Sequence, residues 1–116
     1  MMKSVIVFHD RKMEILVKTG IVVRHYDELM YIVYDAPYCW LHFNDKKYMV
    51  ETSLQLFMGN LPQGDFFQCN RSVIINTRYY KEYIRADALI VMEDHSEFDL
   101  ARRRVMAFNR IRSNLL

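Results

Sequence analysis

Phe66-Phe67-Gln68-Cys69-Asn70-Arg71-Ser72-Val73-Ile74-Ile75-Asn76 is the stretch around which the rest of the chain is organised. An aromatic pair opens it, a short polar segment from Cys69 to Ser72 follows, and a β-branched run ends it at Asn76. Such residues bounded by polar breakers predict a strand, a turn and a second strand. We therefore expect the side chains of Asn70 and Arg71 to be held between two buried strands and to point outward. The alternative is that Arg71 and Ser72 are ordinary turn residues.

The flanking sequence repeats this pattern of short strands and turns. β-Branched runs at 13–18 and 21–24 surround Thr19-Gly20 and predict a hairpin. Further strands are predicted at 5–8, 31–34, 38–43, 47–51, 77–84, 88–92 and 97–100. Apolar residues at helical spacing predict short helices within 53–61 and 105–115. The expected fold is mostly β, with elongated antiparallel sheets of about eight to ten short strands and one or two short helices.

Length and composition indicate a single globular domain. The chain has 116 residues, of which 52% are hydrophobic and 26% charged. No apolar run approaches the ~20 residues that span a bilayer, and the apolar start is too short for a signal peptide. We therefore expect a cytoplasmic protein without membrane insertion. Cys39 and Cys69 form neither a metal motif nor a disulfide framework.

The residue types that support catalysis are sparse. None of the four histidines pairs with another His, Cys or carboxylate at metal-ligand spacing, so no metal site is expected. The three glycines form no phosphate-binding loop, which argues against a nucleotide cofactor. Ser72 lacks the context of a catalytic serine. We expect neither enzymatic activity nor a cofactor.

The net charge is only +2, but basic residues concentrate near the end of the chain. Residues 101–116 contain five arginines and no acid. A solvated helix whose arginines favour its C-terminal dipole end would explain Arg110 and Arg112. It does not explain the run at 102–104, which lies at the helix start, where the dipole disfavours cations. This run is a candidate nucleic-acid contact.

Several ordered blocks of this sequence resemble the LytTR family of bacterial DNA-binding domains. The blocks are Leu29-Met30-Tyr31-Ile32, Ser53-Leu54, Leu61-Pro62, Phe66, Asn70-Arg71-Ser72-Val73-Ile74-Ile75-Asn76 and Leu100-Ala101-Arg102. The resemblance covers roughly residues 12–113. It divides the chain into an N-terminal extension, residues 1–11, and a LytTR-like domain, residues 12–116.

The resemblance implies a sequence-specific regulator of transcription that binds double-stranded DNA through strand-connecting loops. Transferred to this sequence, the loop contacts are Asn70 and Arg71 in one loop and Arg102 in another. The third contact falls near Tyr38 or Cys39. Arginine and amide side chains can form bidentate hydrogen bonds with base edges in the major groove. Ser72 and Arg103 are expected to help by holding phosphates.

The sequence departs from the family pattern at three of these blocks. Asn70 replaces the usual histidine, Ala101 replaces the usual serine, and Val33 replaces the usual acid. An amide is itself a competent base contact, so Asn70 is expected to alter which base is preferred. The departures bear on the target sequence more than on the fold.

Expected partners follow from the same resemblance. Double-stranded DNA with tandem repeats is the expected target, with two copies side by side as a dimer on DNA and without a stable dimer in solution. Because few residues precede the first matching strand, a regulatory protein partner would act from another chain. The alternative function is a protein-interaction module that uses exposed strand edges or the aromatic Tyr79-Tyr80-Tyr83 cluster. Ordinary core or cross-strand packing is the simpler explanation for those tyrosines.

Overall fold

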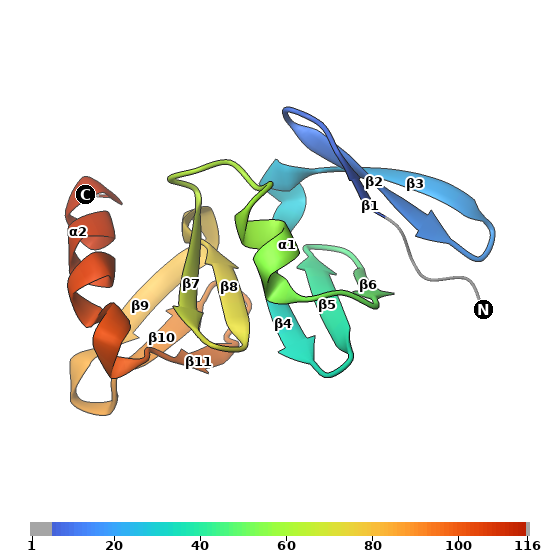
Figure 1. Cartoon of the computed structure of the whole chain (residues 1–116). Helices are drawn as coiled ribbons and strands as arrows, with labels where there is room; N and C mark the ends of the chain where they lie inside the picture. Colours follow the sequence, from blue (N-terminus) through green and yellow to red (C-terminus); the bar gives the residue numbers. More distant parts are fainter. Residues whose placement is uncertain (1–5, 116) are drawn as a thin grey trace.

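The computed structural model describes residues 6–115 and shows an elongated, mostly β molecule (Figure 1). Its principal extents are 44 × 26 × 24 Å. Within the described residues there are eleven strands in three antiparallel sheets, two α-helices and four 3₁₀ turns. This confirms the expected fold class, with eleven strands where about eight to ten were expected.

The central sheet has five strands in the order β6-β5-β4-β8-β7. Their bounds are β4 (Leu29–Asp35), β5 (Tyr38–Phe43), β6 (Lys47–Val50), β7 (Phe66–Asn70) and β8 (Val73–Asn76). β4 joins the two hairpins by pairing antiparallel with β8, with Tyr31 opposite Ile75 and Val33 opposite Val73. The stretch that organises the sequence therefore forms two of the five strands of the central sheet, β7 and β8.

Two three-stranded sheets lie beyond it. The first has the order β1-β2-β3, with β1 (Ile6–Phe8), β2 (Lys12–Val17) and β3 (Gly20–His25). The second has the order β11-β10-β9, with β9 (Tyr80–Ile84), β10 (Leu89–Met92) and β11 (Glu97–Asp99). β1 belongs to the expected N-terminal extension and pairs along its length with β2. Val5, the first residue of the expected strand, lies outside the described residues.

Neighbouring residues of the central sheet face two different cores, because side chains alternate along a strand. Ile32 and Ile74 belong to one buried cluster, whereas Tyr31 and Ile75 belong to the other. All four side chains are at most 5% exposed. The central sheet is thus covered on both faces, which explains why β8 is apolar at Val73, Ile74 and Ile75 in succession.

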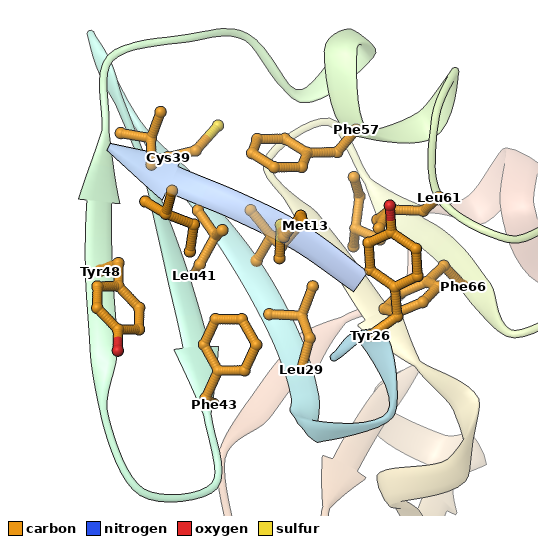
Figure 2. Close-up of a cluster of buried hydrophobic side chains, with 14 of the residues drawn as sticks. Met13, Tyr26, Leu29, Cys39, Leu41, Phe43, Tyr48, Phe57, Leu61 and Phe66 are labelled. Atoms are coloured by element: carbon orange, nitrogen blue, oxygen red, sulfur yellow. The ribbon is translucent and has the colours of Figure 1, made fainter. Parts of the chain in front are cut away.

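The first core lies between the central sheet, the N-terminal sheet and helix α1 (Leu54–Met58), as Figure 2 shows. Met13 from β2, Leu41 from β5 and Phe57 from α1 meet there, each fully buried. The Phe8 ring packs edge-on against Phe57 with ring centroids 5.8 Å apart. The predicted amphipathic helix is confirmed; Ser53 is its N-cap residue but makes no side-chain cap hydrogen bond.

The second core lies between the other face of the central sheet, the C-terminal sheet and helix α2 (Val105–Leu115). Fully buried Phe108 is the centre of its aromatic packing. Phe67, Tyr80 and Tyr83 lie around it with ring centroids 5.2–5.6 Å from its own. The predicted terminal helix is confirmed over Val105–Leu115, although the side chain of Leu115 lies outside the description.

Candidate nucleic-acid interface

Three strand-connecting segments lie along one edge of the molecule, the lower edge in Figure 1. They are the β4–β5 turn, the β7–β8 turn and the segment that leads from β11 into α2. Because β4 runs antiparallel to β8, the end of β4 lies beside the start of β8. The Tyr34 N–H donates a hydrogen bond to the Ser72 carbonyl at 2.7 Å and joins the first two segments.

The second and third segments are joined by backbone and side-chain hydrogen bonds. The Ala101 N–H donates to the Cys69 carbonyl at 2.9 Å. The Asn70 Nδ2 donates to the Asp99 carbonyl at 2.7 Å, and its Oδ1 accepts from the Ser72 N–H at 2.8 Å. The half-buried Asn70 amide therefore shapes its own turn and holds that turn against β11. In this arrangement both ends of the amide are engaged within the protein.

Arg71 lies at the tip of the β7–β8 turn and is exposed. Across residues 6–115, its guanidinium takes part in neither a hydrogen bond nor an ion pair. Burial of Cys69 and Val73 on either side anchors the turn that carries it. The side chain is thus a free cation on a fixed support, as the sequence predicted for this position.

The 3₁₀ turn η4 (Arg102–Arg104) gives three successive arginines different surroundings. Arg104 is half-buried, donates from Nε to the Gln68 carbonyl at 2.9 Å and stacks its guanidinium 4.8 Å from the Phe67 ring centroid. Arg102 and Arg103 are exposed, and their guanidinium groups have no protein partner in the described part of the chain. Arg104 fastens the turn to β7, which leaves its two neighbours free for an external ligand.

A polar groove of about 380 Å³ lies between β7 and η4. Gln68, Asn70, Arg103 and Arg104 line it together with Met58. Guanidinium and amide groups are donors that suit phosphate oxygens. The groove is continuous with the arginine-bearing turns and extends the basic surface along this edge.

The first segment differs from the sequence-based expectation at Cys39. Tyr38, the first residue of β5, is half-buried at the edge, but Cys39 is fully buried and its thiol donates to the Thr52 carbonyl at 3.3 Å. Burial raises the pKa of this thiol to about 11. Alternation along the strand places Cys39 on the face opposite Tyr38, so its side chain supports the core and does not face a ligand.

Arg85 is a basic residue on this edge that the sequence did not single out. It begins the 3₁₀ turn η3 (Arg85–Asp87) between β9 and β10 and is exposed. The Leu100 N–H donates to the Ala88 carbonyl at 2.8 Å, which places this turn beside the segment that leads to η4. Its local sequence is that of an ordinary turn, so only the tertiary structure reveals its position.

The family model for the LytTr DNA-binding domain matches residues 19–113. The chain belongs to the LytTR family of DNA-binding domains. As a LytTR domain it binds DNA within a regulator of transcription, and the family is not catalytic.

Among solved structures, the LytTR fold described here is similar to the LytTr DNA-binding domain of a methyl-accepting/DNA response regulator from Bacillus cereus. The TM-score is 0.78 at 18% sequence identity, over 89% of this chain and 97% of that chain. At this identity the likeness shows the fold. A search of curated proteins gives no match to the chain.

Three other features of the LytTR domain concern metals, membranes and the tyrosine cluster. Within residues 6–115, no cluster of three or more His, Cys, Asp or Glu side chains has the geometry of a metal site. Neither described helix is long and apolar enough to cross a membrane. The Tyr80 and Tyr83 rings pack on Phe108, in keeping with the simpler explanation for the tyrosine cluster.

Proposed function

We propose that this LytTR domain recognises a specific double-stranded DNA sequence through the three segments on its lower edge. The observation that carries the proposal is the coupling of these segments by short hydrogen bonds, while Arg71, Arg102 and Arg103 remain free of protein partners. Cations carried on rigidly held turns, with no internal contacts to break, can bind DNA at little cost in ordering the backbone.

Arg71 and Arg102 are the proposed base contacts. An arginine that forms bidentate hydrogen bonds with guanine O6 and N7 discriminates against other bases by about 1–3 kcal/mol. Arg103, Tyr38 and the Ser72 hydroxyl are proposed to contact phosphates and set the register. Asn70 is proposed to act mainly by positioning Arg71, because its amide already bonds to Asp99 and Ser72.

The proposed target consists of spaced repeats, each bound by one copy of the domain. The turns along the lower edge are proposed to enter successive major grooves, as the family resemblance implies. Since the proposed target is DNA, we place the protein in the cytoplasm.

The experiment is selection from random duplexes at two salt concentrations with the full chain, followed by affinity measurements on the enriched site. Arg71→Ala and Arg102→Ala are each expected to weaken specific binding about 5- to 150-fold, the equivalent of ~1–3 kcal/mol. Log affinity should fall with log salt by ~0.9 per phosphate neutralised.

The matched control is Arg78→Ala. Arg78 is also exposed, but it lies in the 3₁₀ turn η2 (Thr77–Tyr79) at the opposite edge, 3.8 Å from Asp27. Its loss should leave specific affinity within about twofold. Failure to enrich any site, or equal losses for Arg78→Ala and Arg71→Ala, would contradict the proposed interface.

A further inference from the structure

β3 is an edge strand of the N-terminal sheet with an unpaired side. It pairs with β2 over its whole length, from Gly20 opposite Val17 to His25 opposite Lys12, without a register shift. The order β1-β2-β3 leaves its other side without a neighbour among the described strands. Such an edge presents backbone donors and acceptors that another strand can pair with.

The hydrogen-bond alternation identifies which residues face outward. The Tyr26 N–H donates to the Arg11 carbonyl at 3.1 Å, across the end of the β2–β3 ladder. In an antiparallel ladder every second residue bonds to the same neighbour. Arg24, Val22 and Gly20 therefore bond to β2. The N–H and C=O groups of the residues between them, Ile21, Val23 and His25, point away from the sheet.

The other strand edges in the described structure are charged, covered or short, and β1, the opposite edge of the same sheet, is uncharged but only three residues long. β6 begins at Lys47, β9 contains Lys81 and Glu82, and β11 contains Glu97 and Asp99. The edge of β7 is already occupied, since the Cys69 carbonyl accepts from the Ala101 N–H. Charged or covered edges resist pairing with another chain.

β3 has none of these protections. Its six residues contain no proline, lysine or acid, and its ladder has no bulge. Ile21 is 63% exposed and Val23 is 49% exposed. Both side chains lie on the outer face of the sheet, where Val23 is opposite Glu14 and Ile21 is opposite Leu16. The strand therefore offers free backbone groups next to an exposed apolar surface.

We propose that β3 pairs antiparallel with β3 of a second copy of this chain, about a two-fold axis at Val23. This register places Val23 opposite its own counterpart and Ile21 opposite His25 of the second copy. Every outward N–H and C=O of the strand then finds a partner, and the two exposed apolar surfaces become continuous. The two N-terminal sheets join into one six-stranded sheet.

The charges at the ends of β3 suit a second copy of the same chain. Exposed Lys18 precedes the strand, and Asp27 follows it, with a 73% exposed side chain that makes only a long 3.8 Å contact to Arg78. Antiparallel pairing brings the start of one β3 to the end of the other, so each lysine approaches the acid of the other copy. The only buried cation of the strand, Arg24, faces inward and is already paired with Glu28 and Asp45.

This contact is separate from the proposed DNA contacts. β3 lies at the upper right of Figure 1, whereas the arginine-bearing turns lie along the lower edge. One strand pair buries less than a standard protein interface, so we expect a dimer that dissociates in roughly the micromolar to millimolar range.

The test is sedimentation velocity of the full chain without DNA, from about 1 μM to about 1 mM. Wild type should shift from monomer to dimer across this range. Val23→Lys should abolish the shift, because it places two like charges at the axis. Val23→Pro should do the same by removing an outward N–H, while the bonds from β3 to β2 remain.

Met49→Lys is the matched control. Met49, on β6, is 45% exposed, so the same charge is added at an equally exposed apolar site away from β3. It should dimerise as wild type does. Melting curves of all three variants confirm that they are folded. A wild type that stays monomeric, Val23 variants that still dimerise, or a Met49→Lys protein that loses the dimer would each overturn the proposal.

A duplex with a single selected site separates this proposal from the proposed function. Val23→Lys should bind that duplex within about twofold of wild type, since β3 is remote from the arginine-bearing turns. Loss of DNA binding by wild type itself would overturn the function and leave the dimer in place. A selective loss in Val23→Lys would overturn the separation of the two surfaces.

Discussion

At the scale of the residue, the Asn70 side chain holds the β7–β8 turn in place. Asn70 accepts from the Ser72 N–H and donates to the Asp99 carbonyl, so one side chain closes the turn and attaches it to β11. These two bonds fix the amide in an orientation set by the protein. We therefore attribute to it the orientation of Arg71.

Asn70→Ala should reduce both stability and DNA affinity. It leaves the Ser72 N–H and the Asp99 carbonyl without their partner, at a cost of about 1 kcal/mol for a half-buried site. Urea denaturation measures the first effect and titration of the selected duplex the second. Exposed Asn114 supplies the control, because Asn114→Ala should change neither quantity. Unchanged affinity in a destabilised Asn70→Ala protein would show that the turn is correctly held without the amide.

At the scale of the element, a polar cluster around Arg24 attaches the N-terminal sheet to the central sheet. Arg24 on β3 is 9% exposed and contacts Asp45 at 2.6 Å, Glu28 at 2.9 Å and the Tyr48 hydroxyl at 3.1 Å. Its guanidinium also lies 4.2 Å from the Phe43 ring centroid. Burial alone would lower the pKa of Arg24, but the hydrogen bonds with Asp45, Tyr48 and Glu28 outweigh it and raise the pKa.

This cluster makes stability depend on acid pH. The hydrogen bond from Arg24 lowers the pKa of the Asp45 carboxyl. A carboxyl whose pKa is lower in the folded state stabilises the fold above its unfolded pKa, ~3.9, and this contribution disappears as the pH falls through the folded value. Urea midpoints should therefore fall below about pH 4.

Asp45→Asn should be less stable than wild type at pH 7, and the difference between the two should shrink below about pH 4. The control is Asp87→Asn, since Asp87 is exposed and forms no ion pair within residues 6–115. A difference between Asp45→Asn and wild type that stays constant from pH 7 to pH 3 would contradict a role for this ion pair.

At the scale of the whole molecule, the central sheet belongs to both cores. Ile74 and Ile75 are adjacent on β8, each fully buried, and they face opposite clusters. Tyr31 adds a hydrogen bond on the side of the second core, because its hydroxyl donates to the Asp94 carboxylate in the β10–β11 turn at 2.7 Å. Burial raises the pKa of Tyr31 to about 12, so the hydroxyl stays protonated as a donor at neutral pH.

Shared use of one sheet predicts cooperative unfolding. Ile74→Ala and Ile75→Ala should each cost about 2–5 kcal/mol and should shift the same single transition in calorimetry. Met106→Ala is the control, since Met106 on α2 is 71% exposed and its loss should cost less than about 0.5 kcal/mol. Two separate transitions, each sensitive to only one of the isoleucine variants, would show that the cores unfold independently.

The sequence by itself determined most of the strands, both helices and the arginine-bearing turns, but the strand predicted over 77–84 begins only at Tyr80, after the 3₁₀ turn η2. Alternation and helical spacing are local properties, so the β5 faces, the α2 helix and the turn at Arg71 followed from residue order alone. The LytTR motif then connected these turns to DNA. Arg102 and Arg103 stood out because three successive arginines at a helix start have no local explanation.

Only the tertiary structure decided which of these residues are free to act. Local patterns do not encode contacts between distant segments, such as Asn70 with Asp99 or Arg104 with Gln68. These contacts make Asn70 and Arg104 supports and leave Arg71, Arg102 and Arg103 as available cations. The position of Arg85 on the same edge and the unpaired side of β3 likewise depend on sheet order, which long-range pairing determines.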